Sequence, residues 1–195
     1  MRPVGVLREL ERVDLAVYRA VERTHTPALD APLRQISRLA NHAKLWLAIA
    51  ALLFMFGGRS GRRAALTGAA AVGVNSFIVN VPLKFMGRRE RPARSTDDDL
   101  EERHVRMPTS TSFPSGHSAS GFAFAQAVAA IRPELGPPLR GLAAVVAYSR
   151  VHTGVHYPGD VLAGSLIGMA IGEGTARASR RLSRKLTAQA GQQRS

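Results

Sequence analysis

The sequence predicts an all-α protein: a membrane-embedded bundle of about five spanning helices, preceded by amphipathic N-terminal helices. Several long stretches of the 195-residue chain carry no charge, and residues 64–83 are long enough to span a bilayer. Glycine and other small residues are frequent in these stretches, as is typical of closely packed membrane helices. Charged flanking segments explain why the mean hydropathy is only -0.05. The alternative is a soluble all-α domain, because most of the apolar stretches are shorter than a standard span.

Residues 1–42 are predicted to form two amphipathic helices separated at residues 24–27. Apolar side chains recur three or four residues apart on either side of this break: Val6, Leu10, Val13, Val17 and Val21, then Leu29, Leu33, Ile36 and Ala40. Such a pair either packs onto the bundle or lies in the membrane interface, and the sequence favours neither. Charged residues interrupt the first stretch, so it does not resemble a signal peptide.

Residues 43–177 are predicted to form the bundle, and residues 178–195 a frayed basic tail. The five hydrophobic helices are expected near residues 43–58, 64–84, 115–131, 139–152 and 160–177. Two turns, one glycine- and arginine-rich at 57–63 and one proline-rich at 133–138, would lie at one end of the bundle. Two polar loops, 85–114 and 153–159, would then emerge together at the other end.

The chain is strongly basic, with 27 Lys and Arg against 14 Asp and Glu and a formal net charge of +13. This balance suits an anionic partner such as nucleic acid, an anionic lipid headgroup or a phosphorylated substrate. The chain has no cysteine. This excludes disulfides, thiolate metal ligands and a cysteine nucleophile.

Three groups of polar residues border the two polar loops. The first runs from Lys84 to Pro92 and contains several arginines, which bind phosphate oxygens through planar, multidentate hydrogen bonds. The second, Phe113–Ser118, has the Pro and Ser typical of a helix N-terminus, where backbone N–H groups bind anions. Its histidine, His117, is either placed beside a bound anion or is simply a polar residue at a helix end.

The third group runs from Ser149 to Asp160. Arg150 ends one apolar helix and Asp160 begins the next, and charges in such positions are candidates for function. His156 lies between them. An imidazole nucleophile needs one nitrogen free and its other N–H held by an acceptor, which Asp160 can supply.

In this order, the three groups resemble the type 2 phosphatidic acid phosphatase superfamily. Its pattern is Lys, six residues, Arg-Pro; then Pro-Ser-Gly-His; then Ser-Arg, five residues, His, three residues, Asp. Every fixed position is present here: Lys84, Arg91, Pro92, Pro114, Ser115, Gly116, His117, Ser149, Arg150, His156 and Asp160. The resemblance covers about residues 27–175. Bacterial membrane members often have six spans, whereas this sequence predicts five.

The resemblance also implies a role for each matched residue. The expected phosphate-binding residues are Lys84, Arg91, Ser115, Gly116 and Arg150. His156 would attack phosphorus and form a phosphohistidine, and Asp160 would hold its ring. His117 would protonate the leaving alcohol and then activate water. No metal and no cofactor are expected, because positioning and positive charge suffice for phosphoryl transfer.

The resulting prediction is a lipid phosphate phosphatase that passes several times through the cytoplasmic (inner) membrane of a bacterium. Its substrate would be phosphatidic acid, phosphatidylglycerophosphate, a polyprenyl diphosphate or a polyprenyl-linked sugar phosphate of the cell envelope. The bilayer and the lipid are the expected partners, with no nucleic acid and no predicted oligomeric state. The short basic turn at 59–63 favours the outer side for the active site, although a simple count of Lys and Arg on the two sides points the other way.

Several alternatives share some of these features. A soluble acid phosphatase and a vanadate-dependent haloperoxidase share the motif set, and a basic lipid-binding adaptor would need neither histidine. His152 and His156 have the spacing of a metal pair, but Gly154 and Pro158 argue against a regular helix there. The acidic run at 97–102 resembles a magnesium-diphosphate cluster, yet the chain lacks a second one and a solvated loop is favoured.

Overall fold

A computed structural model describes residues 3–84, 89–94 and 103–192, and within these ranges the chain is helical with no strand. The predicted all-α class is therefore confirmed. The N-terminal segment forms α1 (Pro3–Arg23) and α2 (Pro27–Leu39). The bundle consists of α3 (Lys44–Phe56), α4 (Gly58–Ile78), α7 (Gly116–Ala129), α8 (Gly136–His152) and α9 (Pro158–Gln192). Three short helical segments complete the fold: η1 (Asn41–Ala43), the π-helical η2 (Val79–Leu83) and η3 (Pro133–Leu135).

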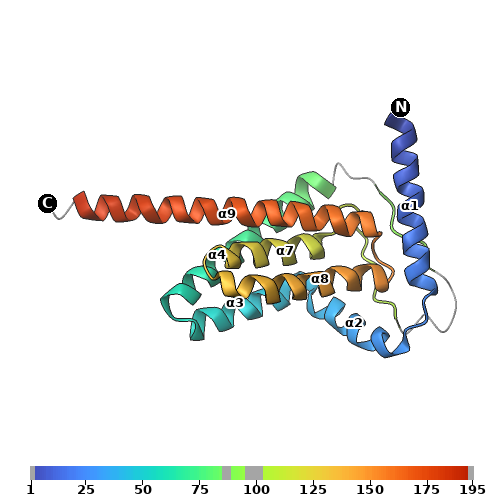
Figure 1. Ribbon diagram of the computed structural model, residues 1–195, viewed down its shortest axis with the longest axis horizontal. Coiled ribbons are helices and arrows are strands. Elements are labelled where there is room, and N and C mark those ends of the chain that lie inside the picture. Colours follow the sequence, from blue (N-terminus) through green and yellow to red (C-terminus); the bar gives the residue numbers. More distant parts are fainter. Residues whose placement is uncertain (1–2, 85–88, 95–102, 193–195) are drawn as a thin grey trace.

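Helix α7 is the centre of the bundle and packs against α4, α8 and α9 (Figure 1). Its sequence is apolar or small on every side, which is the pattern of a helix that is covered all round. Phe124 of α7 meets Trp46 of α3 with ring centroids 5.6 Å apart, and both side chains are fully buried. Helix α7, which begins at the Pro-Ser-Gly-His motif, is therefore held by neighbouring helices along its length.

Three glycines of α9 allow it to lie directly on α7. A Cβ at Gly164, Gly168 or Gly172 would stand 2.4, 2.2 or 2.4 Å from the carbonyl oxygens of Ser115, Ala119 and Ala123, respectively. Glycines four residues apart share one face of a helix, so they let the two backbones approach along three turns. This contact brings the start of α9, with Asp160, against the start of α7.

Two element boundaries differ from the sequence prediction. Helix α4 begins at Gly58, so the arginines of the expected turn at 59–63 are already helical and only Gly57 and Gly58 turn the chain. Helix α9 continues to Gln192 instead of ending near 177, because residues 178–192 contain no proline and only one glycine to interrupt it. The acidic run at 97–102, expected in a solvated loop, lies outside the described residues.

Helix α1 runs crosswise over one end of the bundle, where the loops before α7 and between α8 and α9 also lie (Figure 1). The two polar loops thus share one end, as predicted. Tyr18 of α1 is buried against α8 and α9, while Leu10, Val13 and Val17 remain exposed. The N-terminal helix therefore packs onto the bundle and still presents an apolar face.

Within the described chain, one helical stretch, Gly58–Leu83, is long and apolar enough to cross a membrane. The count rises to at most two if the pair Pro27–Leu39 and Asn41–Phe56, bent by 65°, forms one span. Helices α3, α7 and α8 have 13, 14 and 17 residues, at or below the usual length of a span. The expected number of five spans stays a prediction.

The α7–α9 contact predicts a sharp difference between two glycines of the same helix. Gly168→Ala should lower the free energy of unfolding by about 1–3 kcal/mol, because its methyl group would collide with backbone that cannot move aside. Gly174→Ala is the matched control, since nothing lies within 4 Å of its Cβ position. Thermal unfolding of both variants in detergent tests this, and equal midpoints would contradict the close packing.

Candidate active site

A cavity of about 340 Å³ opens at the loop end of the bundle. It brings together six of the eight predicted site residues from all three motifs: Lys84, Arg91, Gly116, His117, Arg150 and His156. The other two, Ser115 and Asp160, lie behind the residues that line the cavity and are fully buried. The rest of the described lining is neutral or histidine: Ala40, His42, Ala43, Ser76, Pro108, Ser110 and Ser120.

One wall of the cavity is formed by cations from separate segments. Pro82 lacks an N–H and disturbs the last turn of α4, which widens into the π-helical η2 just before Lys84. Lys84 Nζ donates to Ser110 Oγ at 3.0 Å, and Arg91 Nε donates to Ser110 O at 2.8 Å. Burial, Arg91 and Arg150 lower the pKa of Lys84. With no acidic side chain in the described lining, this wall is suited to an anion.

Arg150 is the most deeply buried of these cations, with only 2% of its surface exposed. Its Nη1 donates to the hydroxyl of Ser37 on α2. Its buried Nε has no hydrogen-bond partner among the described protein atoms. A buried cation with an N–H still to be satisfied is well suited to an oxygen of a phosphate held in the cavity.

The start of α7 forms a second wall. Ser115 is the N-cap residue, and its hydroxyl accepts hydrogen bonds from the N–H and the hydroxyl of Ser118. Gly116 and His117 then line the cavity with the first turn of the helix, whose N–H groups have no helical acceptor. The structure therefore places the helix N-terminus at the cavity, whereas the Ser115 hydroxyl is directed into the cap.

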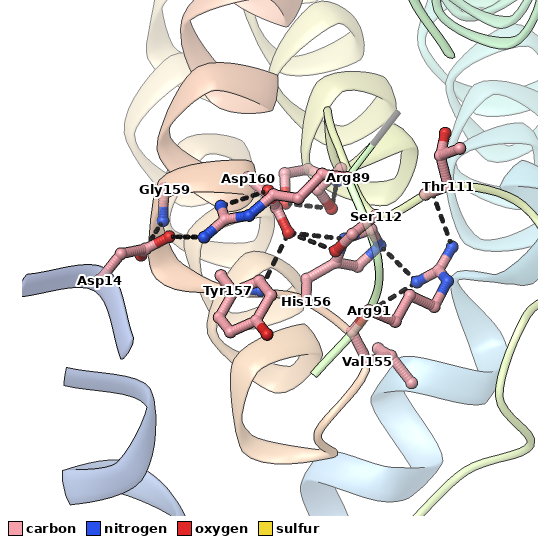
Figure 2. A network of polar contacts seen from close by, with 12 residues as sticks. Asp14, Arg89, Arg91, Thr111, Ser112, Val155, His156, Tyr157, Gly159 and Asp160 are labelled. Carbon is pink, nitrogen blue, oxygen red and sulfur yellow. Dashed lines mark hydrogen bonds and ion pairs between the residues drawn. The ribbon is translucent and has the colours of Figure 1, made fainter. Parts of the chain in front are cut away.

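His156 lies in the turn between α8 and α9, with its two ring nitrogens in different surroundings (Figure 2). Nε2 is 3.3 Å from Nη1 of Arg91 on the cavity side. Nδ1 is 3.5 Å from Ser112 Oγ and 3.6 Å from Asp160 Oδ2. Burial, opposed by Asp160 and assisted by Arg150, lowers the pKa of His156 to about 4. The ring is therefore neutral near pH 7, as a nucleophile must be.

Asp160 supports His156 from behind. Its Oδ2 accepts hydrogen bonds from the Ser112 hydroxyl and from Tyr157 N–H, the latter at 3.0 Å, and its Oδ1 accepts from Arg89 at 2.9 Å. These donors stabilise the ionised carboxylate. The expected contact between His156 and Asp160 is present, and Ser112 contacts both of these residues.

Sequence reasoning missed the partners that come from outside the motifs. Asn41 Oδ1 lies 2.9 Å from His117 Nε2 and orients that ring, Ser37 bonds Arg150, and Ser112 bonds Asp160. Asn41 and Ser37 are separated by more than 70 residues from the groups they contact. No spacing in the sequence signals such contacts, although Ser112 lies only two residues before the Pro-Ser-Gly-His motif.

The structure separates the histidine pair at 152 and 156, whose spacing in the sequence is that of a metal pair. Helix α8 ends at His152, and Gly154 follows in a left-handed conformation, so the two rings do not share a helical face. His152 Nε2 instead pairs with Asp30 of α2 at 2.7 Å. Among the described residues, no group of three or more His, Cys, Asp or Glu could hold a metal ion.

Comparison with known proteins decides the family. Residues 64–184 match the model of the PAP2 superfamily, which is well over half of the chain. The chain belongs to the PAP2 superfamily.

Relatives of the chain include PAP2 phosphatases. A decaprenylphosphoryl-5-phosphoribose phosphatase of Mycolicibacterium smegmatis is 33% identical over 71% of this chain and 72% of its own length. LpxE of Aquifex aeolicus aligns with a TM-score of 0.65 and 26% identity over 85% of this chain and 95% of its own. A transmembrane PAP2 type phosphatidylglycerolphosphate phosphatase of Bacillus subtilis shares the fold, with a TM-score of 0.67 and 21% identity over 91% and 87% of the two chains. The predicted function, a lipid phosphate phosphatase, is confirmed.

The low pKa of His156 predicts how this PAP2 site responds to acid. In the unfolded chain the ring takes up a proton near pH 6.5, but in the folded protein it does so only near pH 4. The stability that depends on a neutral His156 is thus complete above pH 6.5 and decreases as the pH falls toward 4. Histidine NMR in detergent, with His156→Gln to assign the signal, should show an uncharged ring at pH 5.5. A ring that titrates near 6.5 would contradict this environment.

Proposed function

We propose that the chain removes the terminal phosphate from a phosphorylated sugar carried on a polyprenyl phosphate, through a phosphohistidine on His156. The observation that carries this proposal is the cavity itself, whose lining combines Lys84, Arg91, Arg150 and the N-terminus of α7 with His156, the Nε2 of which is 3.3 Å from Arg91 Nη1. The decaprenylphosphoryl-5-phosphoribose phosphatases, 32–33% identical to this chain, act on a lipid of this class.

The neutral side of the cavity favours a sugar phosphate over a simple phospholipid headgroup. His42, Ser76 and Ser120 line the cavity together with the three cations. Hydroxyl and imidazole groups can bind sugar hydroxyls by hydrogen bonding, and binding sites commonly combine a few such groups with apolar walls. A cavity of about 340 Å³ also has room for more than a phosphate group alone.

In the first chemical step, His156 Nε2 bonds to phosphorus while the bond between phosphorus and the sugar oxygen breaks. Lys84, Arg91 and Arg150 balance the charge of the phosphoryl oxygens, with the N–H groups at the start of α7. A protonated His117, stabilised by the incoming phosphate, donates its proton to the leaving oxygen. Asp160 offsets the positive charge that develops on the His156 ring.

In the second step, water attacks the phosphohistidine and His117 takes up the proton that the water loses. The bond between phosphorus and Nε2 breaks, which releases inorganic phosphate and restores both histidines. No step requires a metal ion. The Ser115 hydroxyl accepts a hydrogen bond from Ser118, so Ser115 contributes through the helix cap.

Phosphate release from a panel of purified lipid phosphates tests this function. The polyprenyl-linked sugar phosphate should give a higher kcat/KM than phosphatidic acid, phosphatidylglycerophosphate or a polyprenyl diphosphate, with a chelator present throughout. His156→Ala should abolish turnover and phosphoenzyme labelling, and His117→Ala should lower kcat by about 10²–10⁴-fold. His25→Ala, at an exposed position, is the control. Normal turnover by His156→Ala would overturn the mechanism.

We also propose that the bundle is embedded in the cytoplasmic membrane as a multi-pass protein, with the cavity on the outer side. Exposed apolar side chains cover the long helices as a lipid-facing surface would: Leu47 and Leu52 on α3, Leu66, Val74 and Phe77 on α4, Leu162 and Leu166 on α9. Arginines gather at the opposite end from the cavity, in the first turns of α4 and along the end of α9. Positive charge near short turns favours the cytoplasmic side.

Single cysteines test this orientation, because the chain has none of its own. Thr109→Cys lies on the exposed rim beside the cavity, and Ser60→Cys lies at the far end of the bundle. Thr109 is preferred to Ser110, whose hydroxyl bonds Lys84. An impermeant thiol reagent applied to intact cells should label position 109 and not position 60. The reverse pattern would place the cavity in the cytoplasm.

A further inference from the structure

Helix α1 is joined to the catalytic end of the bundle by a polar contact. Asp14 of α1 is largely buried, with 11% of its side chain exposed. Its carboxylate accepts a hydrogen bond from Gly159 N–H at 2.7 Å and forms an ion pair with Arg89 at 2.6 Å. Gly159 directly precedes Asp160 in the first turn of α9, so Asp14 contacts the segment that carries the catalytic carboxylate.

Arg89 connects this contact to Asp160 itself (Figure 2). Its Nη2 pairs with Asp14 while its Nη1 donates to Asp160 Oδ1 at 2.9 Å. The guanidinium also stacks on the ring of Tyr157, 4.0 Å from the centroid. Its own carbonyl accepts from Ser112 N–H at 2.8 Å, and Ser112 in turn donates to Asp160. Arg89 thus has a carboxylate partner on each side and a ring against its guanidinium, and it does not line the catalytic cavity.

We propose that Asp14 and Arg89 are positioning residues through which α1 holds Asp160, and thereby His156, in catalytic geometry. This inference rests on the proposed role of His156 as nucleophile. Asp160 is completely buried, so its charge needs fixed partners. Because Arg89 binds Oδ1, the other oxygen, Oδ2, is left facing Ser112 and His156 Nδ1.

Arg89 lies between two carboxylates, those of Asp14 and Asp160, and this explains why Asp14 and Arg89 act together. A lone arginine beside Asp160 would neutralise the carboxylate and reduce its ability to stabilise a positive His156 ring. Asp14 shares the charge of Arg89, so Asp160 keeps part of its negative character while its orientation stays fixed. Tyr18 of α1 packs edge-on against Tyr157 with ring centroids 5.5 Å apart, which holds α1 against the turn before α9. The position of α1 therefore bears on the orientation of His156.

Arg89→Gln and Asp14→Asn, made in the full chain and assayed in detergent, test this pair. Arg89→Gln should lower kcat by about 10- to 100-fold with little change in KM, the range seen for partners that orient metal-binding histidines. Asp14→Asn should give a smaller loss of kcat in the same direction, and Arg89→Lys should restore part of the activity. Glu9→Gln, on the exposed side of the same helix, is the matched control and should behave as wild type.

A double-mutant cycle separates positioning from general stability. Arg89 acts through Asp160, so Arg89→Gln should have little further effect in an Asp160→Asn background. Additive losses, or a rise in KM at unchanged kcat, would overturn the proposal. An Asp14→Asn variant with wild-type kcat would show that α1 takes no part, which also overturns it.

Histidine NMR supplies a readout that does not depend on turnover. Without the positive charge of Arg89, and with Asp160 free to turn toward the ring, the pKa of His156 should rise in Arg89→Gln. An unchanged titration in a variant whose unfolding midpoint matches wild type would overturn the proposal. If wild type releases no phosphate from any lipid of the panel, the proposed function fails. If wild type is active and both variants match Glu9→Gln, only the positioning role fails.

Discussion

The structure depends on the buried charge of Asp160. A carboxylate with no exposed surface is stable only if the surrounding chain supplies donors in fixed positions. Those donors come from the loop before α7, from the segment at 89–94 and from the turn after α8. Segments that are far apart in the sequence must therefore converge on one point, and the cavity forms where they meet.

Backbone packing brings this carboxylate to the anion-binding end of α7. Ser115 N–H donates to the carbonyl of Asp160 at 3.0 Å, and Gly164 lies against the same residue one turn further along α9. A larger side chain at Gly164 would separate the two helix starts. The same close approach that stabilises the bundle therefore also sets the distance between His156 and the N–H groups that face the cavity.

The sequence predicted those parts of the site that a local pattern can encode. Helix ends, cations and histidines at fixed spacings were assigned to the correct end of the bundle, because each motif borders an apolar helix. The structure adds partners such as Ser37 for Arg150 and Asp30 for His152, which depend on tertiary packing. The end of α9 was misplaced for a related reason: its last turns are polar, yet they contain no proline and only one glycine, near the end of the helix.

The sequence left open whether the amphipathic N-terminal segment packs onto the bundle, and in the structure its side chains contact several residues of the candidate site. Asn41 contacts His117, Ser37 contacts Arg150, and Asp14 contacts the Arg89 that binds Asp160. All three lie outside residues 64–184, the part that matches the PAP2 model. The matched part thus contains the groups that would act on phosphate, while the segment before it supplies groups that hold them. Helix α1 also exposes Leu10, Val13 and Val17 at this end. A bilayer surface that binds these side chains would therefore affect the position of α1 and its contact with Arg89.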